Sequence, residues 1–346
     1  MPNLAAQFIV IEGMEGAGKS TNLAFLCEQL ERHGIRFRVT REPGGTEIAE
    51  KIRTLLGHKN VCYNVVNIPV IMPKPDLVAL TGGFRKTPVL QQQNHIYCDT
   101  RLMARLIDQQ FTQDSIFPDE LDFTANILAQ WADQHLFSVA AALAFSPAGF
   151  TAFREAVPEK FVAAFVADRA KLREGGNGLS MDANTALQSI PIYLQQLEKQ
   201  LDLAGPYICG EQISIADFSI YHCLWFINNN AGVRYLLENH PKLNQWFATI
   251  QAIGHGTQTP IDATDAIDIA RSAPTEQFSQ DEFIVVNGFT FGEPVAVAAN
   301  DYGIDPVVGE LLVSKQDEVV IKRIDERAGE LYVHFPRVGY KSSALT

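Results

Sequence analysis

The pattern of apolar and polar residues predicts two strand–helix pairs at the start of the chain. The apolar run Phe8–Ile11 predicts a buried strand, and a glycine-rich turn follows it. Leucines at helical spacing predict a helix over Lys19–His33, which ends at Gly34. Phe37–Thr40 predicts a second strand and Glu47–Leu56 a second helix. We therefore expect the N-terminal segment to be a β-α-β-α unit.

A second α/β segment follows, and it begins with another strand. Val61–Ile68 has the apolar content of a buried strand. Thr87–Gln91 and His95–Cys98 are two short strand patterns around a turn, which predicts a hairpin. The hairpin leads into a predicted helix over Asp99–Asp108. These patterns predict a small α/β domain.

The pattern of apolar and polar residues changes twice over the last two thirds of the chain. Apolar positions recur at helical spacing from residue 118 to 255, the next stretch is polar and poor in aromatic residues, and short β-rich runs begin near residue 282. The predicted fold class is therefore α/β plus all-α, with a β-rich appendage. The expected domains are 1–56, 57–110 and 115–255, then a linker over 256–281 and a small β-rich domain over 282–346.

Composition narrows the possible functions. The 346 residues contain 28 Lys and Arg against 40 Asp and Glu, which gives a net charge of −12. An acidic chain is a poor candidate for sequence-independent nucleic-acid binding. No apolar run has the roughly 20 residues that a membrane helix needs, and the five cysteines are scattered without metal-ligand spacing. We expect a cytoplasmic protein with no metal site and no nucleic-acid or membrane partner.

The glycine-rich turn after the first strand matches a phosphate-binding loop. The segment Gly13-Met-Glu-Gly-Ala-Gly-Lys-Ser20 fits GxxxxGK[ST] between a predicted strand and a predicted helix. In such a loop, backbone N–H groups surround a phosphate, the lysine reaches the β- and γ-phosphates, and the serine binds magnesium. The candidate phosphate-binding residues are Gly13, Gly16, Gly18, Lys19, Ser20 and Thr21.

Residues 6–56 closely resemble the start of bacterial thymidylate kinase. The resemblance rests on Ile11–Thr21 and on Thr40-Arg-Glu-Pro-Gly-Gly-Thr46, a stretch that borders the dTMP site in that family. It implies nucleotide contacts from Glu15, Arg41 and Glu42, with ATP and magnesium as cofactors.

The kinase resemblance then stops. The family next requires a strand that ends in Asp-Arg and a basic lid, because phosphoryl transfer depends on surrounding charge. The Asp168-Arg169 pair lies in a helical stretch instead. Kinase activity is therefore an alternative function and not our first.

Residues 57–255 resemble a glutathione transferase. Asn67–Asp76, Lys86–Leu90 and Ile96–Thr100 are arranged like its thioredoxin-like domain, and a long helical region follows. Within that region, Ile213–Phe218 resembles the family's buried capping box, in which Ser214 and Asp217 bond each other's backbone N–H groups.

This resemblance implies a glutathione site. A cis bond before Pro88 would expose the backbone of Thr87 to the cysteinyl backbone of glutathione. Asp99 and Thr100, at a helix N-terminus, would hold the γ-glutamyl group. The alternatives are that Asp99 is only a helix cap and that Pro88 only begins a strand.

The kinase-like residues occupy the place of the transferase's first strand and helix, which normally carry the residue that stabilises the thiolate. We expect the two resemblances to join near Arg53–His58. Residues 37–56 would then complete the thioredoxin-like domain, with Phe37–Thr40 as its first strand. In that arrangement Thr46 is the candidate thiolate partner, and the alternative is that Thr46 is only a helix cap.

Three functions remain open from the sequence. The first is a glutathione transferase-like protein in which the thiolate of glutathione attacks a small electrophile. Its activity would be impaired if the replaced first strand and helix do not stabilise the thiolate. The second is an ATP-dependent nucleoside monophosphate kinase, and the third is a non-catalytic fusion. A homodimer is implied by the transferase resemblance alone.

Overall fold

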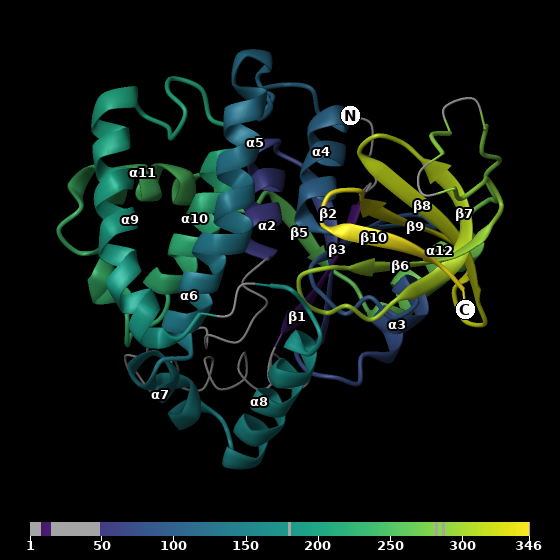
Figure 1. The fold of residues 1–346 in the computed structure, drawn as a ribbon, viewed down its shortest axis with the longest axis horizontal. Coiled ribbons are helices and arrows are strands. Elements are labelled where there is room, and N and C mark those ends of the chain that lie inside the picture. Colours follow the sequence, from purple (N-terminus) through teal and green to yellow (C-terminus); the bar gives the residue numbers. More distant parts are fainter. Residues whose placement is uncertain (1–7, 15–48, 179–180, 281–282, 286–287, 346) are drawn as a thin grey trace, which may run out of the picture.

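The computed structural model describes residues 8–14, 49–178, 181–280, 283–285 and 288–345. Within these residues the strands form a single ten-stranded sheet. Figure 1 shows the helices of residues 119–252 gathered at one end of the molecule and the C-terminal strands at the other. The sheet therefore connects parts of the chain that the sequence assigned to separate domains.

The centre of the sheet belongs to the predicted α/β domain. In it β1 pairs with β2 in parallel and with β3 antiparallel, and β3 pairs with β4 in a hairpin. The predicted hairpin and the predicted helix after it are thus confirmed. The elements are β1 (Phe8–Met14), α2 (Ala49–His58), β2 (Cys62–Pro69), α3 (Pro75–Thr81), β3 (Val89–Gln92), β4 (His95–Cys98) and α4 (Thr100–Gln110).

The first strand of this domain is not the expected one. β1 lies beside β2 where Phe37–Thr40 was predicted, and the other edge of β2 is also paired. Phe8–Ile11 are at most 4% exposed, as a strand covered on both faces requires. Phe37–Thr40 contains Arg38, which would bring a charge into that core, and it lies outside the described residues. The prediction that Phe37–Thr40 supplies the first strand of this domain is therefore wrong, because β1 occupies that position.

Helix α2 agrees with the predicted helix Glu47–Leu56, and it buries two charged side chains. Lys51, 1% exposed, forms an ion pair with Asp133 at 2.7 Å between Nζ and Oδ2. Glu50 Oε1 accepts hydrogen bonds from Tyr221 at 3.2 Å and from His255 at 3.0 Å. The Oε2 atom of Glu50 has no hydrogen-bond partner in the described part of the chain. The contact between α2 and the helical region therefore depends on charged pairs as well as on apolar packing.

The helical region matches the all-α prediction. α10 is its central element, since all but two of its residues are buried. The predicted capping box is present, with Asp217 Oδ2 accepting from the Ser214 N–H at 2.9 Å. The elements are η1 (Asp119–Leu121), α5 (Asp122–Trp131), η2 (Ala132–Leu136), α6 (Phe137–Ala144), α7 (Pro147–Ala156), α8 (Glu159–Arg173), α9 (Ala183–Ala204), α10 (Ile215–Asn228), η3 (Arg234–Leu237) and α11 (Pro241–Ala252).

Among the described residues, no single helix has the length and apolar content to cross a bilayer, although Asp119–Ala144 and Pro147–Glu155 pass that test as a bent pair.

The predicted linker is ordered instead. β5 (Thr257–Pro260) extends the sheet by pairing in parallel with β2. α12 (Ala263–Ser272) buries Ala266, Ile267 and Ala270 between α3 and β9 (Gly329–Pro336). The small apolar residues of α12 recur at helical spacing, a pattern that the overall polarity of the segment obscures. The linker prediction is therefore wrong.

The C-terminal strands continue the central sheet. They are β6 (Pro294–Ala299), β7 (Val307–Ser314), β8 (Glu318–Asp325), β9 and β10 (Tyr340–Ala344). β9 pairs in parallel with β4, which gives the order β10-β6-β7-β8-β9-β4-β3-β1-β2-β5. The predicted β-rich secondary structure is thus present, but these strands continue the central sheet and do not form the separate small domain that was expected.

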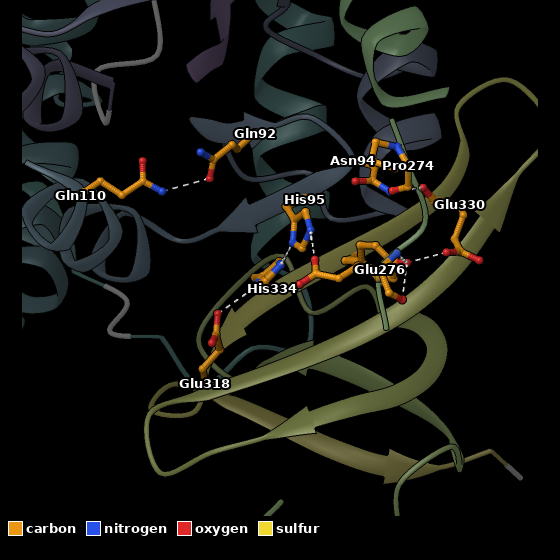
Figure 2. Close-up of polar contacts among 10 residues, drawn as sticks. Gln92, Asn94, His95, Gln110, Pro274, Glu276, Glu318, Glu330 and His334 are labelled. Carbon is orange, nitrogen blue, oxygen red and sulfur yellow. Dashed lines mark hydrogen bonds and ion pairs between the residues drawn. The ribbon is translucent and has the colours of Figure 1, made fainter. Parts of the chain in front are cut away.

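A chain of four side chains crosses the junction between β4 and β9 (Figure 2). His95 and His334 meet at 2.9 Å between Nδ1 and Nε2. Their outer nitrogens bond Glu276 at 2.8 Å and Glu318 at 2.7 Å. Three hydrogen bonds need three protons, and two neutral imidazoles supply two. The donor and acceptor roles of the two rings are therefore linked along this chain.

Candidate functional site

The residues that the sequence analysis assigned to a thiol-peptide site lie together at one edge of the α/β domain. The Thr87–Pro88 peptide bond is cis, as expected, and leads directly into β3. Asp99 and Thr100 lie where β4 passes into α4. All four residues line one cavity of about 90 Å³. The structure therefore brings together residues from two separate segments of the sequence.

Asp99 is positioned by the start of α4. It caps the helix, and its Oδ1 accepts a hydrogen bond from the Arg101 N–H at 2.9 Å. Its backbone is left-handed, with φ of 79°. Its Oδ2 accepts a bond from the Tyr340 hydroxyl at 3.2 Å. The helix-cap role is thus present, and Oδ2 retains a lone pair for another donor.

The C-terminal strands supply a wall of this cavity that the sequence analysis missed. Asn300–Tyr302 follow β6, Val338–Tyr340 lead into β10, and both segments line the cavity. Tyr340 is 241 residues from its partner Asp99. Burial raises the pKa of the Tyr340 phenol well above its usual value, so the hydroxyl stays protonated and donates. No motif marks these residues, because their role depends on the pairing of β9 with β4.

The Asn300–Tyr302 segment contacts both the α/β domain and the helical region. The Lys86 ammonium pairs with Asp301 at 2.5 Å and lies 4.1 Å from the centre of the Tyr302 ring. The N–H groups of Asn177 and Gly178, which follow α8, donate to the backbone carbonyls of Asn300 and Asp301 at 3.0 and 2.8 Å. The segment is therefore held between the sheet and the helical region.

A larger chamber of about 630 Å³ adjoins this cavity and shares Thr87, Phe137 and Asn300–Tyr302 with it. Its walls come from α6, α7 and α8 and from residues 70–87. A chamber of this size accommodates a typical small organic ligand. The two cavities therefore share one wall.

The phosphate loop can be placed only in part. Gly13 lies within β1, opposite Ile68 of β2. The remaining candidates for nucleotide and thiolate chemistry lie outside the described residues: Glu15, Gly16, Gly18, Lys19, Ser20, Thr21, Arg41, Glu42 and Thr46. Asp168 and Arg169 lie in α8, as predicted, where Asp168 pairs with Arg85 at 2.6 Å.

Comparison with known proteins identifies the family. A model of the glutathione S-transferase N-terminal domain matches residues 45–115, and one of the C-terminal domain matches residues 159–255. The crystal structure of a GST-like protein from Pseudomonas syringae is 31% identical to this chain with a TM-score of 0.75, and the alignment covers 99% of this chain and 100% of that protein. The chain belongs to the glutathione S-transferase-like proteins. The alignment of this GST-like chain thus also includes its C-terminal strands.

The front of this GST-like protein is similar to another family. A thymidylate kinase model matches residues 11–68. The thymidylate kinase of Chromobacterium violaceum is 58% identical over 50 residues, 14% of this chain and 24% of that protein. The enzyme of Pseudomonas putida is 55% identical over 53 residues, 15% and 25% of the two chains. The chain spans about a quarter of the length of these relatives, so it carries a kinase N-terminal fragment.

The two family matches overlap over residues 45–68, which include α2 and all of β2 except Pro69. The predicted join near Arg53–His58 lies inside this overlap. Helix α2 and most of strand β2 therefore match both family models.

Proposed function

We propose that this GST-like protein binds glutathione and uses its thiol to attack an electrophile in the adjoining chamber. The observation that carries the proposal is the convergence of the cis Thr87–Pro88 segment and the N-terminus of α4 on one cavity. The backbone of Thr87 would pair with the cysteinyl residue of glutathione. Asp99 would accept the γ-glutamyl amine, and the first N–H groups of α4, with Thr100, would hold its carboxylate.

The shared wall of the two cavities gives the chemical step. A thiol held at Thr87 would lie at the entrance to the chamber. The thiolate sulfur would form a bond to the electrophilic carbon while the leaving group departs with its electron pair. Thr46 remains our candidate for the hydroxyl that donates to the thiolate, with a helix cap as the alternative.

The test compares two aspartates that both cap helices. Asp99→Asn keeps the cap oxygen and removes the charge, and Asp182→Asn makes the same change at the cap of α9. We expect glutathione to raise the unfolding temperature of the wild type and of Asp182→Asn, and to raise that of Asp99→Asn much less. Equal shifts in all three proteins would contradict the assigned site.

The kinase alternative is tested in the same assay. Mg-ATP with dTMP should leave the unfolding temperature unchanged, and Lys19→Ala should leave any glutathione-dependent activity intact. A shift with nucleotide alone would favour the kinase, and a cooperatively folded protein that responds to neither ligand would favour the non-catalytic fusion.

A further inference from the structure

One wall of the large chamber is aromatic. Phe145, Phe150, Phe153 and Phe165 line it from the end of α6 and from α7 and α8. Their rings contact each other, with centroids 5.1 Å apart for Phe150 and Phe153 and 4.9 Å apart for Phe153 and Phe165. This wall offers a flat apolar surface to the body of a ligand.

The same chamber is also lined by cations. Lys74, Arg85 and Arg169 all line it. The carboxylate beside them is Asp168, which pairs with Arg85 at 2.6 Å and with Arg169 at 2.8 Å. Among the described residues, these three cations thus share one anion, and positive charge is in excess.

Lys74 has no counterion among the described residues. It is 4% exposed, and its ammonium forms no ion pair or hydrogen bond with any residue that the structure describes. Burial, with the nearby Arg169, lowers the pKa of its ammonium to about 8, and Asp168 opposes this in part. The Nε atom of Arg169 is also buried without a partner among the described residues. A buried cation of this kind is costly unless an anion joins it.

The other charges of the chamber do not neutralise this excess. Lys86 pairs with Asp301, and Asp133 pairs with Lys51. Arg173, at the end of α8, lines the chamber and has no carboxylate partner among the described residues. This concentration of positive charge occurs in a chain whose net charge is −12.

We propose that the chamber binds an organic anion, with its apolar body against the phenylalanine wall and its carboxylate or phosphate group at Lys74 and Arg169. The inference rests on the proposed function only in taking this anion as the acceptor that the thiol attacks. The binding itself requires no glutathione.

The test uses three probes with one ring system. These are 2-naphthoate, 2-naphthyl phosphate and the uncharged 2-naphthamide, titrated calorimetrically at pH 7 without glutathione. We expect at least one anion to bind about tenfold more tightly than the amide, because a charged hydrogen-bond partner contributes that much. The stronger anion identifies the acceptor as a carboxylate or as a phosphate ester. Equal affinities for all three probes would overturn the proposal.

Variants locate the anion. Lys74→Met should weaken anion binding about tenfold and leave amide binding unchanged, and Lys74→Arg should retain anion binding. Lys160→Met, which changes an exposed lysine of α8, is the control and should alter neither. Anion affinity unaffected by Lys74→Met would refute the assignment.

The wild type provides a test that does not depend on a variant folding. Its affinity for the anion should fall as the pH rises from 7 to 9, because Lys74 loses its proton near pH 8, whereas its affinity for the amide should stay constant. An anion affinity that does not change over this range would contradict the role of Lys74. Since glutathione is absent from these titrations, a protein that binds naphthoate but not glutathione would sink the proposed function and leave this inference standing.

Discussion

Separating Lys51 from Asp133 tests how the kinase-like helix α2 is held in this fold. Lys51→Met leaves Asp133 without its partner, and Asp133→Leu leaves the Lys51 ammonium in the core. Breaking a fully buried pair costs about 3–5 kcal/mol of unfolding free energy. Asp133 is 23% exposed, so water compensates part of its loss, and we expect about 2–3 kcal/mol for Lys51→Met. Lys51 is 1% exposed, so Asp133→Leu should reach the full range.

The double variant is the informative one. With both charges replaced by apolar side chains, no buried ion remains, and we expect stability within about 1 kcal/mol of the wild type or above it. Urea unfolding followed by tryptophan fluorescence measures all four proteins, and Lys199→Met on the exposed face of α9 should change stability by less than about 0.5 kcal/mol. Two single costs that simply add in the double variant would refute the reasoning, because they would show that the two side chains do not interact.

Other features of the structure give further predictions. Tyr340→Phe removes the hydroxyl that orients Asp99, and we expect about three- to tenfold weaker glutathione binding by calorimetry. Gly176→Ala places a Cβ against the backbone carbonyl of Asp301 and should disrupt the contact of residues 176–178 with Asn300–Tyr302. Limited proteolysis should therefore cut residues 176–178 faster than in the wild type. Burial and the charge of His334 lower the pKa of His95 below 6.5. Burial raises the pKa of Glu318, but its hydrogen bond to His334 and the charge of that ring outweigh this effect and bring the pKa below 4.5. The unfolded chain therefore binds more protons in acid, so the urea midpoint should fall as the pH drops below 6.5 and again below 4.5, and a flat profile would contradict this.

The sequence predicts the elements of this fold better than their connections. Phe8–Ile11 and the capping box of Ser214 and Asp217 are local patterns, and both are present as expected. The partners of Asp217 beyond that box, the Ile208 N–H and the Trp246 ring N–H, come from distant parts of the chain. Local spacing carries no information about such contacts.

The same distinction applies to the site. Thr87, Asp99 and Thr100 were predicted because the short stretches around them, at strand and helix boundaries, carry the resemblance to a glutathione transferase. Tyr340 and Asp301 were not, because a parallel pairing between strands more than 200 residues apart brings them to the cavity. Lys74 was missed for another reason: a single lysine in a proline-rich loop has the pattern of an exposed residue, and only packing shows that it is buried.

The ten residues of α2 have a consequence for how proteins are assembled from fragments. They lie in the stretch that two family models both match, and their apolar face packs in the core while Glu50 and Lys51 bond to side chains of the helical region. A crossover placed inside a helix that both parents share preserves the register of every element after it. Recombination at such a point can give a foldable chain even when the exchanged segment has lost the rest of its original enzyme.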